Sequence, residues 1–313
     1  MSFANAYRTV KPAVVAIASR YERDPTDFPL VFGTGFFVSE EGVVCTCRHI
    51  ADAILAQPKP ADSKGFPAVV LVFASTEVKS GRVFGYVSLE IESIGHAAVI
   101  GDKTGYLGPD PPDVSYLLVN AIGTPRVEIS AEPLQEGEVV AFAGFPMGRK
   151  LLKAPGWLHQ VSATLHSGVV GAVLPHQTAP IPHGFLVHAN TQGGASGSPV
   201  FREDGTVVGM VYMGVPDVEE AKAPGGAVFR YEVPTSITGC MSREVLAQLV
   251  PLVEKEARAS RKQSVPPSLD KWMEKFGEGN LKAGANIFEG MWPPKVRAHG
   301  DASSHPPPQP KPK

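Results

Sequence analysis

The chain has 313 residues, of which 43% are hydrophobic and 19% are charged, and its formal net charge is −2. This length and apolar content allow one large domain or two smaller ones with buried cores. The near-neutral charge and the lack of a basic run give no reason to expect nucleic acid or an acidic membrane as a partner, so we expect neither.

The N-terminal segment and the cysteines indicate in which cellular compartment the protein is expected. The first apolar stretch is only about seven residues long and follows no basic leader, so we expect neither a signal peptide nor a membrane span. The three cysteines are Cys45, Cys47 and Cys240. An odd, low count is typical of reduced thiols in a cytoplasmic protein, and no second cysteine pair stands at ligand spacing. We therefore predict a cytoplasmic protein without metal or cofactor.

Short apolar runs suited to β-strands follow one another along the chain. The first group lies at residues 13–19, 34–39, 42–46, 68–74, 85–95 and 113–119. After a break near residues 120–135, a second group lies at residues 138–144, 158–165, 168–173, 184–189, 198–201, 206–215 and 227–234. Frequent glycines and prolines separate the runs, so two consecutive all-β barrels or sandwiches fit better than alternating strands and helices.

The pattern changes from Thr235 onward. Apolar residues then recur at helical spacing at Ile237, Met241, Val245, Leu249 and Val253. This predicts a helix packed on the β core, capped by Thr235 or Ser236 and kinked or interrupted at Pro251. We expect a helical extension over residues 246–300 and a disordered, proline-rich tail over 301–313.

The stretch TQGGASGSPVF, residues 191–201, surrounds Ser196 with small residues. Gly193, Gly194 and Gly197 give the backbone the freedom to turn so that the N–H groups of Gly194 and Ser196 converge on one point. Such an arrangement suits a serine nucleophile, which needs a histidine base, an orienting carboxylate and donors for an oxyanion. Taken alone, the stretch is better explained as a glycine-rich hairpin with no chemistry.

A histidine and an aspartate upstream favour the catalytic interpretation. His49 stands where an apolar strand ends, and Asp113 stands at the start of the run DVSYLLV. Asp102 and Asp110 lie nearby but neither opens an apolar strand, and we interpret Asp52 as a cap or surface residue. Histidine, aspartate and serine in this order, on two halves of a tandem β protein, are the composition of a catalytic triad.

Several motifs in the same order resemble the trypsin-like (chymotrypsin-fold) serine proteases, and among them the disulfide-free HtrA/Deg branch most. The similar segments are GTGFFVSEEGVVCTCRHI, DVSYLLV, EGEVVAFAGFPMG, TQGGASGSPVFREDGTVVGMV and FRYEVPTSI. The resemblance covers roughly residues 10–245. That branch usually carries a peptide-sensing PDZ domain, for which the residues after Cys240 are too few and too rich in proline.

The resemblance implies a fold and an activity. The fold is two tandem six-stranded antiparallel β-barrels within residues 1–245, at about 10–120 and 130–235, with the active site between them. The implied activity is peptide-bond hydrolysis in proteins or peptides through an acyl-enzyme. His49 would be the general base, Asp113 the orienting carboxylate and Ser196 the nucleophile, and the N–H groups of Gly194 and Ser196 would form the oxyanion hole.

The resemblance also implies a substrate-binding segment. Val211, Tyr212, Met213 and Gly214 stand where the family pairs with the substrate backbone and forms a pocket wall. Asn190 lies near the position of a charged pocket floor. Since no carboxylate stands there, we expect small or medium apolar side chains at the cleavage site rather than basic ones.

Two alternatives remain open. Ala195 replaces the acidic residue that secreted relatives use for activation by N-terminal cleavage, so a catalytically silent binding module is the competing hypothesis to an enzyme. His176, His183 and His188 offer zinc-type ligands, but their uneven spacing is typical of a loop, and we expect no metal there. The oligomeric state is left open.

Overall fold

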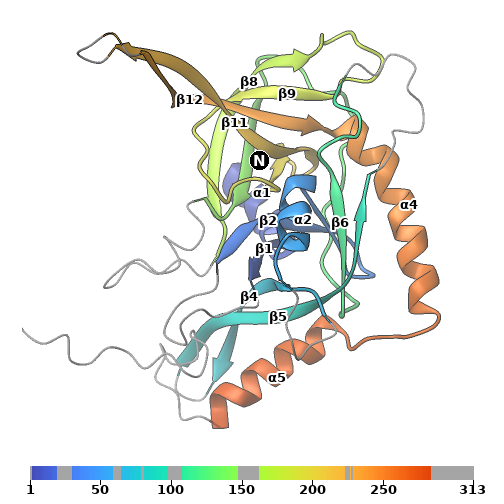
Figure 1. Cartoon of the computed structure of the whole chain (residues 1–313). Coiled ribbons are helices and arrows are strands. Elements are labelled where there is room, and N and C mark those ends of the chain that lie inside the picture. The colour runs from blue at the N-terminus through green and yellow to red at the C-terminus, as the bar shows by residue number, and fades with distance from the viewer. Residues whose placement is uncertain are drawn as a thin grey trace, which may run out of the picture.

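The computed structural model describes residues 2–19, 30–58, 65–78, 81–97, 108–146, 162–222, 226 and 228–282. Within these ranges the strands form two closed barrels of six strands each, and every strand pairs with its neighbours in antiparallel fashion. The predicted fold class is therefore confirmed. The two barrels lie one above the other in Figure 1.

The first barrel is built from the chain up to the break. Its strands are β1 (Val14–Ser19), β2 (Val31–Ser39), β3 (Val43–Thr46), β4 (Ala68–Val78), β5 (Gly81–His96) and β6 (Ser115–Val119). They close in the order β1-β2-β3-β6-β5-β4. β3 pairs with β6 so that Thr46 lies opposite Ser115. The residues that follow β3 and the residues that precede β6 therefore lie at the same end of the barrel.

The second barrel follows the same plan. Its strands are β7 (Val139–Gly144), β8 (Thr164–Leu174), β9 (Gly184–His188), β10 (Pro199–Phe201), β11 (Val207–Lys222) and β12 (Val228–Ser242). They close in the order β10-β11-β12-β9-β8-β7. β11 and β12 continue past the barrel as a two-stranded ribbon, seen at the upper left of Figure 1. β8 covers the predicted run at 168–173 and the end of the run at 158–165, of which residues 158–161 lie outside the described residues.

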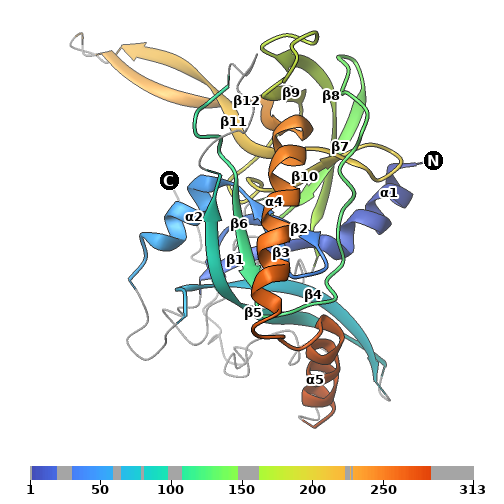
Figure 2. The ribbon, with the colours of Figure 1, turned by 90° about the vertical axis from the view of Figure 1, so that its right-hand side faces the viewer.

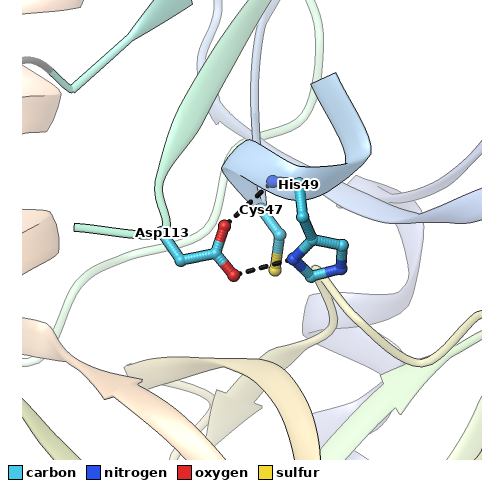
Figure 3. A group of neighbouring side chains, drawn as sticks. All are labelled: Cys47, His49 and Asp113. Carbon is cyan, nitrogen blue, oxygen red and sulfur yellow. Dashed lines mark hydrogen bonds and ion pairs between the residues drawn. The ribbon is translucent and has the colours of Figure 1, made fainter. Parts of the chain in front are cut away.

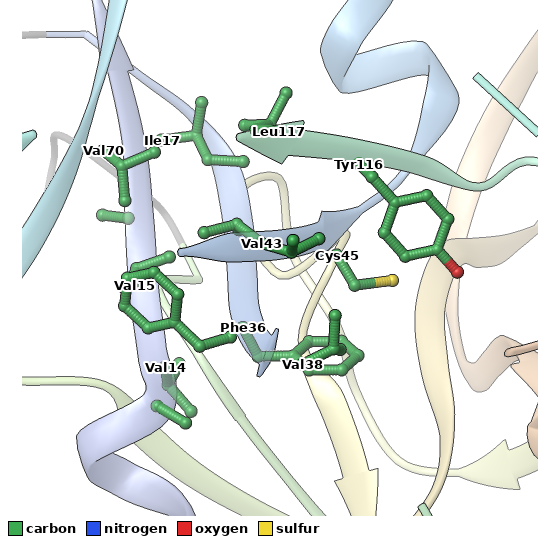
Figure 4. Close-up of a cluster of buried hydrophobic side chains, with 14 of the residues drawn as sticks. Val14, Val15, Ile17, Phe36, Val38, Val43, Cys45, Val70, Tyr116 and Leu117 are labelled. Atoms are coloured by element: carbon green, nitrogen blue, oxygen red, sulfur yellow. The ribbon is translucent and has the colours of Figure 1, made fainter. Parts of the chain in front are cut away.

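Apolar strand residues fill the first barrel, as the continuous hydrophobic runs predict. All six residues of β1 and all four of β3 are buried. Ile17, Phe36 and Leu117 lie in this core with no exposed surface, and Figure 4 shows them packed with valines from β1, β2, β3 and β4. Burial of this surface is the main force that closes the barrel.

The described helices are α1 (Phe3–Val10), α2 (Arg48–Leu55), α4 (Arg243–Arg261) and α5 (Leu269–Lys282), and a short 3-10 helix covers Lys11–Ala13. The predicted helix after the second barrel is real but begins later than expected. Residues 237–242 belong to β12, because each pairs with β9 or β11 and residues 238–241 pair with both. Pro251 lies inside α4 without ending it.

α4 runs along the side of the molecule and contacts both barrels, as Figure 2 shows. Its N-terminal Arg243 donates to the carbonyl of Ser130, and Arg261 at its other end donates to the carbonyl of Glu41 at 3.0 Å. α5 packs on β4 and β5. The last part of the predicted helical extension, residues 283–300, and the proline-rich tail predicted for 301–313 lie outside the described residues. Among the described helices, none combines the length and apolar character needed to cross a bilayer.

Candidate active site

His49 and Asp113 are brought together by the pairing of β3 with β6. Thr46 ends β3 and Ser115 begins β6, and the two residues lie opposite one another. His49 follows Thr46 by three positions, in the first turn of α2, and Asp113 precedes Ser115 by two. Strand register thus places side chains 64 residues apart at the same end of the barrel.

Two hydrogen bonds join His49 to Asp113, as Figure 3 shows. The backbone N–H of His49 donates to Oδ1 at 2.9 Å, and Nδ1 of its ring lies 2.7 Å from Oδ2. An ionised carboxylate only accepts, so the ring proton sits on Nδ1 and Nε2 keeps a free lone pair. This is the tautomer that a general base requires.

The charge of Asp113 is stabilised by the same bonds. Burial acts to raise the pKa of this carboxyl, but the hydrogen bonds from the ring and backbone of His49 outweigh burial, and the pKa lies below its ordinary value. Asp113 is therefore ionised at neutral pH. The alternative Asp52 faces Arg48 and His96, each at 3.7 Å, and Asp102 lies outside the described residues.

Ser196 lies in the loop between β9 and β10. Its hydroxyl donates to the carbonyl of Tyr212 at 3.2 Å. Within the described part of the chain, no hydrogen bond joins this hydroxyl to the His49 ring. In this conformation the serine is therefore held by the backbone of β11.

The loop before Ser196 forms a tight turn over residues 192–195. The N–H of Ala195 donates to the carbonyl of Gln192 at 3.0 Å, and Gly194 has a φ of +98°. A positive φ at the third position only is the signature of a type II turn, which favours glycine there. Among the described residues, the N–H groups of Gly194 and Ser196 donate to no partner, so both are free to bind an oxyanion.

Thr34 of β2 holds this loop from the first barrel. Its hydroxyl donates to the carbonyl of Gly194 at 2.7 Å, and its N–H donates to the carbonyl of Ser196 at 2.8 Å. The same hydroxyl accepts the N–H of Phe145 at 3.0 Å. Thr34 was not predicted from the sequence, although the glycines on both sides of it in GTGFF are a sign that backbone approaches closely there.

Gly197 shows how closely the two barrels approach at this point. Its φ is +88°, and a Cβ on this residue would lie 1.8 Å from the carbonyl oxygen of Thr34. Its N–H donates to the carbonyl of Val211 at 2.7 Å. Ala195, which lacks the acid of secreted relatives, is buried at 2% exposure. Neutral backbone bonds, rather than an ion pair at position 195, shape the loop.

A pocket of about 300 Å³ opens beside Ser196. The residues that line it are Thr191, Gln192, Gly193, Ala195, Ser196, Val211, Met213, Gly214, Val215, Pro216, Glu232, Pro234 and Thr235. Three of the predicted substrate-binding residues, Val211, Met213 and Gly214, are among them. Asn190 is exposed, and Tyr212 contacts Ser196 through its backbone carbonyl. Neither residue lines the pocket. Glu232, from β12, is a lining carboxylate that sequence analysis missed.

Cys47 lies next to the His49–Asp113 pair, and these three are the only group of possible metal ligands that the described ranges contain, with ligand atoms within 4.8 Å of one another. Each is already engaged, since the thiol of Cys47 donates to the carbonyl of Val211 at 3.3 Å. Burial, the nearby charge of Asp113 and Cys45 raise the pKa of this thiol well above its ordinary value. A protonated thiol is a poor metal ligand. His176, His183 and His188 form no such group.

Two barrels, with a His–Asp pair on one and a serine in a glycine turn on the other, define the class of two-barrel serine proteases. The model of the trypsin-like peptidase domain matches residues 33–210, more than half of the chain. The chain belongs to this family, and the predicted resemblance is confirmed. Among curated proteins, none matches its sequence.

Three solved structures similar to this chain share little sequence with it. A serine-to-alanine mutant of Rv3671c from M. tuberculosis H37Rv, in an inactive form, is 19% identical with a TM-score of 0.44, over 79% of this chain and 89% of that one. A serine endoprotease of Yersinia pestis is 18% identical with a TM-score of 0.47, over 82% and 67%. The HtrA-type protease AlgW with a tripeptide is 16% identical with a TM-score of 0.45, over 81% and 64%.

Proposed function

We propose that this protein is a serine endopeptidase that hydrolyses peptide bonds in proteins through an acyl-enzyme intermediate. One observation carries the proposal: the His49 ring is fixed through Nδ1 to an ionised Asp113, which leaves Nε2 as a base. The side chain of His49 is 48% exposed, so a substrate can reach the ring. Membership in a peptidase family supports the same conclusion.

In the proposed reaction, Ser196 attacks the carbonyl carbon of the substrate. In this reaction the hydroxyl leaves the carbonyl of Tyr212 and turns toward His49, and Nε2 accepts its proton. The new Ser196 Oγ–carbon bond forms as the peptide C–N bond breaks, and the amine leaves with the proton from His49. His49 then accepts a proton from a water molecule, which attacks the ester on Ser196. The carboxylic acid product leaves, and Ser196 regains its proton from His49.

The negative charge that develops on the substrate oxygen is met by the N–H groups of Gly194 and Ser196. Their lack of protein partners supports this role, because a donor already engaged elsewhere would have to be released first. Thr34 holds the carbonyls of both residues, so the donors keep one orientation through the reaction.

The test is covalent labelling together with a peptidase assay. We expect a fluorophosphonate probe to label the folded protein at Ser196, and Ser196→Ala and His49→Ala to abolish both labelling and cleavage. His176→Ala, an exposed histidine outside the site, is the matched control and keeps activity. Cleavage that persists in Ser196→Ala disproves the proposal.

A catalytically silent binding module is the second candidate. The observation that favours it is the hydrogen bond of Ser196 to Tyr212 rather than to His49. If this bond is permanent, folded protein will resist the fluorophosphonate while still binding peptides. Labelling of Ser196 at a rate that falls in His49→Ala eliminates this candidate.

A further inference from the structure

Glu232 is the one ionisable side chain among the described residues that line the pocket beside Ser196. The other lining residues are neutral, and several are apolar. A lone carboxylate in a pocket of this kind is a feature that selects ligands by charge.

Glu232 reaches the pocket from the ribbon of β11 and β12. Val218 pairs with Glu232 and Pro216 pairs with Pro234, so these four side chains share one side of the ribbon. Pro216, Glu232 and Pro234 all line the pocket. We call this side, made of Pro216, Val218, Glu232 and Pro234, the inner face of the ribbon.

Among the described residues, the carboxylate of Glu232 has no partner, unlike those of Glu219 and Glu220 on the same ribbon. Glu220 is paired with Arg230 at 2.7 Å, and Glu219 accepts a hydrogen bond from the hydroxyl of Tyr231 at 2.8 Å. Within the described chain, the side chain of Glu232 has neither an ion pair nor a hydrogen bond. Arg230, two residues before Glu232 on the same side of the ribbon, is already paired with Glu220, so the carboxylate of Glu232 is available to a positively charged ligand.

The remaining walls suit an apolar chain rather than a second charge. Met213 is 40% exposed, and it lines the pocket together with Val215, Pro216 and Pro234. Lysine and arginine combine an apolar stem with a cationic end, and they lay the stem along apolar surface while the charge seeks a polar partner. Such a side chain matches both the walls and Glu232.

We infer that this pocket takes a lysine or arginine side chain of the substrate, on the residue before the cleaved bond, and that Glu232 selects it. The inference rests on the proposed peptidase function and deepens it. It replaces the sequence-based expectation of an apolar preference. That expectation rested on the lack of a carboxylate near Asn190 and on Met213 nearby, whereas Glu232 reaches the pocket from β12.

The effect has a definite size and a definite salt dependence. Glu232 is largely exposed, and an exposed ion pair changes an equilibrium by about fivefold at most. We therefore expect about a fivefold preference for lysine over norleucine, which has the same stem without the charge. Raising the ionic strength from about 0.05 M to about 0.5 M should reduce this preference for lysine, because salt screens exposed charges.

The experiment compares two fluorogenic peptides that differ only by lysine or norleucine before the cleaved bond. In the wild type, kcat/KM favours lysine about fivefold. In Glu232→Gln, which keeps the shape and removes the charge, the ratio falls to about one. Glu219→Gln, on the opposite side of the ribbon, is the matched control and keeps the preference. Equal cleavage of both peptides, or a lysine preference that survives Glu232→Gln, overturns the inference.

A binding measurement separates this inference from the proposed function. Fluorescence anisotropy with the same peptides is measured on Ser196→Ala, which needs no catalysis. A lysine preference that disappears in Ser196→Ala/Glu232→Gln supports the role of Glu232 even if the wild type proves uncleaving and unlabelled. Equal affinity for the two peptides overturns that role even if the wild type is an active peptidase.

Discussion

Asp113 is the residue on which the geometry of the candidate site depends most. One carboxylate oxygen accepts the backbone N–H of His49, and the other lies against its ring. The first bond fixes the start of α2, and the second fixes the tautomer of the base. The Asp113 side chain therefore both supports the start of α2 and orients the His49 ring. A single substitution can separate these two roles.

Asp113→Asn is expected to lower kcat/KM by about four orders of magnitude while the fold is kept. An asparagine amide can still contact the ring, but it no longer requires the proton to sit on Nδ1. Steady-state kinetics on the peptide substrate, with circular dichroism as the control for folding, measures the effect. A loss of less than about tenfold would show that Asp113 does not set the tautomer.

The same substitution tests the direction of the Asp113 pKa. Although burial acts to raise it, hydrogen bonds from His49 hold the pKa of folded Asp113 below the ordinary 3.8. The unfolded chain therefore binds this proton first as pH falls, so the stability that Asp113 contributes is present above about pH 4 and is lost below it. In urea unfolding, the stability difference between wild type and Asp113→Asn should shrink from pH ~5 to pH ~2. A difference that is constant over this range contradicts the assignment.

At the scale of elements, β2 of the first barrel supports the loop that carries Ser196 in the second. Thr34 lies against Gly197 so closely that a Cβ at Gly197 would overlap the carbonyl oxygen of Thr34. Neither barrel by itself contains both His49 and a shaped serine loop. The candidate site is therefore a product of how the two barrels dock.

Thr34→Val is expected to lower kcat by about tenfold to a hundredfold with a smaller change in KM. Valine has nearly the same shape but cannot donate to the carbonyl of Gly194 or accept from the N–H of Phe145. The donors for the oxyanion then lose their fixed orientation. Thr34→Ser, which restores the hydroxyl, should recover most of kcat. If Thr34→Ser is as slow as Thr34→Val, packing rather than hydrogen bonding explains the loss.

At the scale of the whole molecule, α4 joins the end of the second barrel to the first. Its apolar residues Val245, Leu246 and Leu249 are buried, and so is Arg261, which is 7% exposed. The guanidinium of Arg261 donates to carbonyls of Glu41 and Val119 and pairs with Glu92. The helical extension is thus part of the folded unit.

Arg261→Met is expected to lower the free energy of unfolding by about 2–4 kcal/mol, because the carbonyl of Glu41 loses its donor, the carbonyl of Val119 keeps only the N–H of Ala121, and Glu92 loses its ion pair. Arg258→Ala removes a surface pair with Glu254 on the same helix and a longer one with Glu41 at 3.8 Å, and because both are exposed or half-exposed it should cost about 0.5–1 kcal/mol or less. Urea unfolding of both variants gives the comparison. Equal, small losses would show that α4 is an appendage rather than a support.

Some features were predictable from the sequence because they are local. Alternating and continuous apolar runs predicted the strands, and ordered motifs predicted the family, since strand period and turn residues depend on neighbouring positions. The start of α4 was predicted too early, because residues 237–242 have an apolar spacing compatible with a helix. Pairing with β9 and β11 keeps them in a strand, and such pairing is a long-range interaction.

The sequence by itself determined the fold class, the family and the residues proposed for catalysis. Only the tertiary structure decided that Thr34 supports the serine loop, that Ser196 now bonds to Tyr212, and that Glu232 faces the pocket. Each of these depends on the register of strands far apart in the chain. Register is set by closure and docking of the barrels, which no local pattern encodes.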